Sequence, residues 1–177
     1  TRAGFLIAYA ADRRLDLAAI EDLAAIPAVV ARRWCVDLER VALTGHSSGG
    51  LVASAIAFSE HSRGMALAIA PSAAGITAAQ LGERTCPPPL SVMVMHGARD
   101  TLFPLVEGHG AEAARWWASC NRCSAEPVPS EQASCVAFAG CADGVETRYC
   151  ETDTPHTAWP DLNGPLIEFL AEATRAR

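Results

Sequence analysis

Lysine is absent from this 177-residue chain, and its 14 basic residues are all arginine. We take the absence as a coding bias and attach no mechanism to it. The basic residues are outnumbered by 20 aspartates and glutamates, which gives a formal net charge of -6. No basic run is present that would neutralise a phosphate backbone, so the sequence argues against nucleic acid as a partner.

Long apolar runs are also missing, since none approaches the roughly 20 residues that span a bilayer. Thr1 does not open a charged-then-apolar signal segment. We therefore expect a soluble mature chain without a membrane partner. Half of the residues are apolar, enough for a buried core, and no internal repeat is visible. We expect residues 1–177 to form one domain, and the sequence gives no oligomeric state.

Cysteine, by contrast, is abundant: there are seven. Five lie in a short stretch: Cys120, Cys123, Cys135, Cys141 and Cys150. The clustering indicates an oxidising compartment and disulfides, hence a secreted or periplasmic protein. The spacing of Cys120 and Cys123 also fits half a zinc site, but no second such pair follows, so we predict no metal. The odd count leaves at least one unpaired thiol, with Cys35 and Cys86 as candidates.

Apolar runs alternate with helical patterns along the chain, which predicts an α/β fold with a mostly parallel sheet covered by helices on both faces. The expected strands are 4–10, 40–44, 65–70, 91–96 and 145–150. The expected helices are 16–35 with an interruption near Pro27, a helix after residue 50, 107–119 with at least one tryptophan against the sheet, and 162–173. Residues 120–144 are expected to be irregular.

A GxSxG pattern centred on Ser47 follows the second expected strand and precedes a helix. Such a strand–turn–helix holds a nucleophilic serine on a strained turn, and Gly45 and Gly49 let the backbone segments pass closely. At ordinary Gly and Ser frequencies the pattern arises by chance in about one chain in twenty of this length. Its context favours a nucleophile over an inert serine in a tight turn.

A serine nucleophile needs a base and a group that orients the base. Asp100 lies just past the strand 91–96, at the sheet edge where sites form, and His156 lies in a loop before the last helix. The order Ser47, Asp100, His156 is that of α/β-hydrolases. The alternative for Asp100 is a turn carboxylate paired with Arg99.

The remaining histidines have simpler interpretations. His96 ends a strand, and His61 and His109 are expected on the surface. Three residues are candidates to line a substrate pocket: His46, inside the GxSxG pattern, Phe103 and Trp159, although aromatic side chains are as often core.

Taken together, five segments resemble the secreted polyhydroxybutyrate depolymerase and feruloyl esterase group of α/β-hydrolases: GFLIAYA, RVALTGHSSGG, SVMVMHGARDTLFP, the cysteine-bearing stretch and PHTAWP. The resemblance implies an extracellular esterase without metal or organic cofactor, with Ser47, Asp100 and His156 as the triad. Two features depart from the family. Pro155 stands where glycine is usual and Ala158 is inserted before Trp159, so the loop that holds the base is expected to differ.

The family's first oxyanion loop, an HG-containing turn before the strand GFLIAYA, is not found in this chain, which is therefore either a fragment or a minimal variant. The backbone N–H of Ser48 can still donate to an oxyanion, but no second donor is identifiable. We expect acyl transfer on polyester or feruloyl-type esters, with activity falling below a pH in the mid-sixes. The alternatives are a carboxylesterase of small acyl esters and an inactive binding domain.

Overall fold

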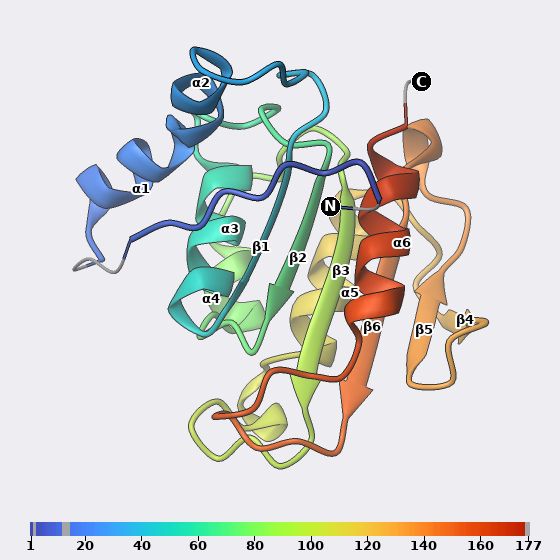
Figure 1. Cartoon of the computed structure of the whole chain (residues 1–177). Helices are drawn as coiled ribbons and strands as arrows, with labels where there is room; N and C mark the ends of the chain where they lie inside the picture. Colours follow the sequence, from blue (N-terminus) through green and yellow to red (C-terminus); the bar gives the residue numbers. More distant parts are fainter. Residues whose placement is uncertain (2, 12–14, 176–177) are drawn as a thin grey trace.

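A six-stranded sheet organises the chain in a computed structural model that describes residues 1, 3–11 and 15–175 (Figure 1). The strands stand in the order β1-β2-β3-β6-β5-β4. Their bounds are β1 Ala42–His46, β2 Ala68–Ser72, β3 Ser91–Gly97, β4 Pro127–Pro129, β5 Cys135–Phe138 and β6 Thr147–Thr152. The helices are α1 Leu17–Ala24, α2 Ile26–Ala31, α3 Ser48–Phe58, α4 Ala78–Gly82, α5 Ala111–Cys120 and α6 Asn163–Ala173, with short 3₁₀ turns at Leu105–Glu107 and Ala142–Gly144.

The predicted α/β class is confirmed, because β1, β2, β3 and β6 pair in parallel. The central strand β3 is buried along its whole length, as expected of an apolar run covered on both faces. The prediction that residues 120–144 are irregular is partly wrong. Within them β4 and β5 add an antiparallel edge to β6. The two prolines of β4 hide its strand pattern in the sequence, and proline is tolerated there because β4 is the outermost strand.

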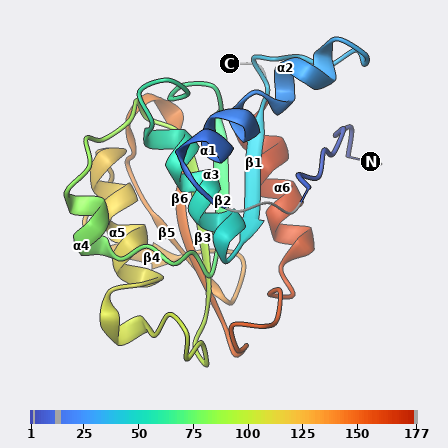
Figure 2. The same ribbon diagram turned by 90° about the vertical axis from the view of Figure 1, so that its left-hand side faces the viewer.

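Helices cover both faces of the sheet (Figure 2). On one face α3 and α5 enclose an apolar cluster in which Trp117 is 1 % exposed, which confirms the expected indole against the sheet. On the other face α6 buries Leu166 and Phe169 against Met93 and Met95 of β3. The predicted interruption of the first helix is also confirmed, since α1 ends at Ala24 and Pro27 lies in the first turn of α2.

The strand predicted over residues 4–10 does not form. Residues 5–11 carry no regular structure, and the side chains of Leu6, Ile7 and Tyr9 are 46 %, 55 % and 89 % exposed. An apolar run becomes a strand only where a neighbour accepts its backbone hydrogen bonds. At this end of the sheet the outer strand is β1, and the 5–11 segment does not pair with it.

Three disulfides confirm the expected oxidised cysteines: Cys86–Cys120, Cys123–Cys141 and Cys135–Cys150. The last joins the neighbouring strands β5 and β6. Cys86 is therefore paired, and Cys35, which is exposed, is the free thiol among the described residues. Cys120 and Cys123 belong to two different disulfides, so their thiolates do not form half of a zinc site.

None of the described helices is both long enough and apolar enough to cross a membrane.

Candidate active site

Ser47 sits on a sharp turn between the end of β1 and the first residue of α3. Its backbone φ of 55° is in the left-handed region, which is rare for a residue with a side chain and typical of a strained functional turn. The turn brings Gly45 so close to the following helix that a Cβ at Gly45 would lie 2.5 Å from the Gly49 carbonyl carbon. The turn therefore requires glycine at position 45.

The second glycine of the pattern has a different role from the one expected. A Cβ on Gly49 would meet nothing within 4 Å, so Gly49 itself is not sterically required. The next residue is, because a Cβ on Gly50 would lie 2.9 Å from the Ser72 carbonyl oxygen. The close packing of α3 on the strands thus depends on Gly45 and Gly50.

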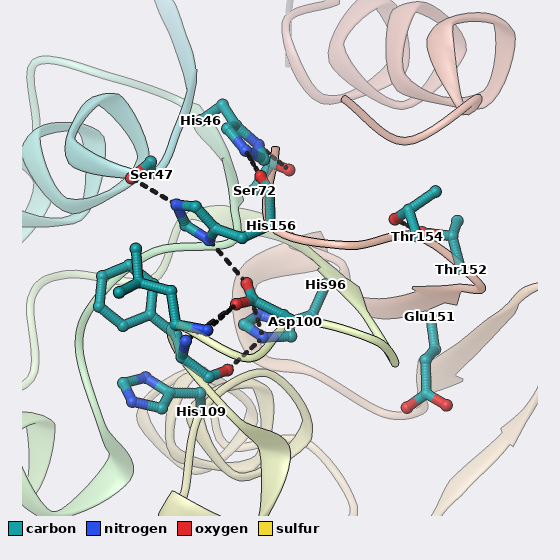
Figure 3. A network of polar contacts seen from close by, with 12 residues as sticks. His46, Ser47, Ser72, His96, Asp100, His109, Glu151, Thr152, Thr154 and His156 are labelled. Carbon is teal, nitrogen blue, oxygen red and sulfur yellow. Dashed lines mark hydrogen bonds and ion pairs between the residues drawn. The ribbon is translucent and has the colours of Figure 1, made fainter. Parts of the chain in front are cut away.

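The structure brings Ser47, His156 and Asp100 together in one hydrogen-bonded line (Figure 3). His156 Nε2 lies 2.9 Å from Ser47 Oγ, and His156 Nδ1 lies 2.8 Å from Asp100 Oδ2. A carboxylate can only accept, so Nδ1 carries the proton and the lone pair of Nε2 faces the serine hydroxyl. This is the tautomer that a general base needs.

Asp100 is held in its ionised form. Burial of its carboxyl opposes ionisation, but the Phe103 N–H, the His156 ring and the Leu102 N–H all donate to the carboxylate, and together they lower its pKa below the usual value. Its side chain is fully buried. Arg99 is not its partner, because the Arg99 guanidinium binds the side chain and carbonyl of Asp153.

His96 is a site residue that sequence reasoning missed. It is 2 % exposed, its Nε2 lies 2.9 Å from the Phe103 carbonyl oxygen, and the same nitrogen lies 3.6 Å from Asp100 Oδ2. A carbonyl only accepts, so Nε2–H is the donor and ties the turn that carries Asp100 to β3. Desolvation by burial lowers the pKa of His96, in opposition to the Phe103 carbonyl and Asp100, and keeps its ring neutral.

His109 was predicted on the surface, and that prediction is wrong. It is 5 % exposed, stacks on the His96 ring with centroids 6.3 Å apart and contacts the Ile76 carbonyl oxygen at 3.3 Å. Its sequence neighbours are two glycines, which gave no periodic signal of burial. His61 is exposed, as expected.

Two of the three suggested pocket residues, His46 and Phe103, contact His156. Both ring nitrogens of His46 are in contact with the protein: Nδ1 is 3.0 Å from Ser72 Oγ and Nε2 is 2.6 Å from the His156 carbonyl oxygen. Phe103 packs edge-on against the His156 ring, with centroids 5.0 Å apart, and fills the space over Gly75.

Trp159 is 38 % exposed, lies 6.0 Å from the His46 ring between centroids, and donates Nε1–H to Asn163. Of the three, Trp159 offers the most apolar surface to a ligand.

Ser48 is the first residue of α3, and the Ser47 side chain makes no capping bond to this helix. The first-turn N–H groups of a helix have no intrahelical acceptor and form the positive end of its dipole. The N–H of Ser48 is one of these groups and directly follows the nucleophile candidate Ser47 in the chain.

Comparisons with known proteins find a likeness in structure but none in sequence family. No protein-family model matches the chain, and no curated protein does. A solved structure described as a thermostable esterase is similar to it, with a TM-score of 0.42 and 16 % sequence identity over 58 % of this chain. The match covers 26 % of that protein, so this chain spans about a quarter of its length.

Proposed function

We propose that this chain is a serine hydrolase of carboxylic esters, with Ser47 as nucleophile, His156 as general base and acid, and Asp100 as the carboxylate that orients His156. The observation that carries the proposal is the continuous line of two short hydrogen bonds, 2.9 Å and 2.8 Å, from the serine through the imidazole to a buried carboxylate. The strained turn at Ser47, with a φ of 55°, supports the same reading, because strained backbone is concentrated at functional sites.

The reaction begins when Ser47 Oγ transfers its proton to His156 Nε2 and adds to the ester carbonyl carbon. The negative charge on the former carbonyl oxygen is stabilised by the Ser48 N–H. The ester C–O bond then breaks, and His156 returns the proton to the leaving alcohol. In the second half, water gives a proton to His156 Nε2 and adds to the acyl carbon of the acyl-enzyme. The bond from that carbon to Ser47 Oγ then breaks, His156 returns the proton to Ser47 Oγ, and the acid is released.

For the substrate we propose a polyester of the polyhydroxybutyrate type or a feruloyl-type aromatic ester, which the motif resemblance implies. The partly exposed indole of Trp159, close to His46 at the site, favours an apolar or aromatic acyl group over a charged one.

The three disulfides fit a secreted or periplasmic protein. We also propose that residues 1–177 form one domain, because helices pack on both faces of a single six-stranded sheet.

A hydrolysis assay tests the proposal. With p-nitrophenyl acetate we expect release of p-nitrophenol by the wild type and loss of that release in Ser47→Ala and His156→Ala. Ser119→Ala, an exposed serine on α5, is the matched control and should retain full activity. A catalysed rate that is equal in the wild type and Ser47→Ala would overturn the proposal, and a wild type no faster than the uncatalysed reaction would favour a domain that only binds.

A substrate panel separates the ester classes. Methyl ferulate, a hydroxybutyrate oligomer and short acyl esters are compared by kcat/KM. A preference for methyl ferulate or the oligomer supports the proposed class, whereas similar values for all short acyl esters and no turnover of the other two would indicate a general carboxylesterase.

A further inference from the structure

We propose that His46 is a positioning residue that fixes the main chain of His156, and that Ser72 sets the tautomer in which His46 does so. The inference rests on the proposed function and deepens it. His46 then belongs to a second hydrogen-bonded line, Ser72 to His46 to the His156 carbonyl, which meets the first line at His156 (Figure 3).

Three segments converge at this second line. His46 ends β1, Ser72 ends β2, and the two are direct partners in the parallel register of these strands. Ser72 is 1 % exposed, so its hydroxyl has no access to bulk water and needs a partner within the protein. His156 lies in the connection between β6 and α6, outside any helix or strand.

The chemistry of the partners fixes where the protons lie. The His156 carbonyl oxygen can only accept, so His46 Nε2 carries a proton and donates it across 2.6 Å. In the neutral ring Nδ1 is then an acceptor, and it takes the hydroxyl proton of Ser72 across 3.0 Å. Ser72 thus favours the one neutral tautomer that can hold the His156 carbonyl.

This bond matters because the His156 ring alone does not fix where its backbone lies. Around it the connection is held by the Arg99 N–H to the Thr154 carbonyl and by a turn from Ala158 N–H to Pro155 O. Among the described residues, the bond from His46 is the one that reaches the main chain of His156 itself. The same bonds use both ring nitrogens of His46, so a substrate would have to break one of them to form a hydrogen bond with this side chain.

The test compares two amides of different reach. In His46→Gln the side-chain amide nitrogen falls near the position of Nε2 and can still donate to the His156 carbonyl. In His46→Asn it falls near Nδ1 and reaches only Ser72. The readouts are the rate at which a fluorophosphonate labels Ser47 by phosphonylation and the separate kcat and KM for p-nitrophenyl acetate, both corrected for the folded fraction.

We expect His46→Asn to lower the labelling rate and kcat by about 10²-fold, the scale of a misplaced catalytic group, with KM changed less than about threefold. His46→Gln should recover most of the loss. A merely structural role predicts equal losses in both variants, and equal rates in both would overturn the inference. A wild type that is not labelled at Ser47 would overturn the proposed function as well, which distinguishes the two failures.

Ser72→Ala provides a second variant, since it keeps His46 and removes one buried oxygen. Without the Ser72 hydroxyl to donate to Nδ1, both neutral tautomers of His46 become accessible, and we expect labelling of Ser47 to slow by about threefold because only a fraction of the molecules holds the competent tautomer. An unchanged rate would refute the role assigned to Ser72.

Discussion

Replacing Asp100 with asparagine should reverse the tautomer of His156 while leaving the fold intact. In the structure Asp100 Oδ1 accepts from the backbone N–H groups of Leu102 and Phe103, each at 2.9 Å, and Oδ2 faces His156 Nδ1 at 2.8 Å. The asparagine carbonyl oxygen must take the Oδ1 position, because two donors point at it. Its NH₂ group then faces His156 Nδ1.

A donor at that position requires Nδ1 to be the acceptor, so the proton moves to Nε2. His156 Nε2 then has no lone pair for the proton of Ser47. We expect kcat to fall by about 10⁴-fold, the effect of the wrong tautomer in a serine triad, with a small change in KM. Because both backbone hydrogen bonds remain, the melting temperature should change little.

The assay is the pre-steady-state burst and turnover of p-nitrophenyl acetate, with circular dichroism to verify folding. Asp153→Asn is the matched control: Asp153 is an exposed carboxylate near the same site, 84 % exposed and paired with Arg99, and its loss should leave kcat within about twofold, as for an exposed ion pair. A folded Asp100→Asn variant with kcat within tenfold of the wild type would refute this account of the acid.

Three further predictions concern the turn, the pH dependence and the thiols. Gly45→Ala should unfold or destabilise the protein by about 1–3 kcal/mol or more, because its Cβ would overlap the backbone of Gly49, whereas Gly49→Ala, with open space, should not; urea unfolding measures both. The lowered pKa of His96 means that the unfolded chain takes up a proton before the folded one as pH falls, so stability should drop below about pH 6.5, with a smaller slope in His96→Gln. Equal slopes would contradict the neutral, buried ring. Thiol titration should find one reactive group, Cys35, in the native protein and seven after reduction and unfolding, and a second native thiol would contradict the pairing.

The parts of the fold that follow from local patterns were predictable. A buried strand such as β3 shows itself as a continuous apolar run, and the turn at Ser47 shows itself through its glycines. The three residues of the proposed triad were placed by their order and by the sheet edge on which they fall. Their mutual distances follow from packing and are visible only in the structure.

What the sequence did not reveal depends on partners far along the chain. The run 4–10 has a strand's composition but no neighbour to pair with, and β4 and β5 form because β6 offers an edge. In the proposed site His46 binds the carbonyl oxygen of His156 and His96 binds that of Phe103. Every residue has the same backbone carbonyl group. No residue pattern signals such a bond.

The most direct test of the central claim is active-site labelling with a fluorophosphonate, followed by mass spectrometry of the digested protein. The account predicts one equivalent of adduct, on Ser47, in the folded wild type and none in Ser47→Ala. Folded wild type that remains unlabelled, or an adduct on a different serine, would contradict it.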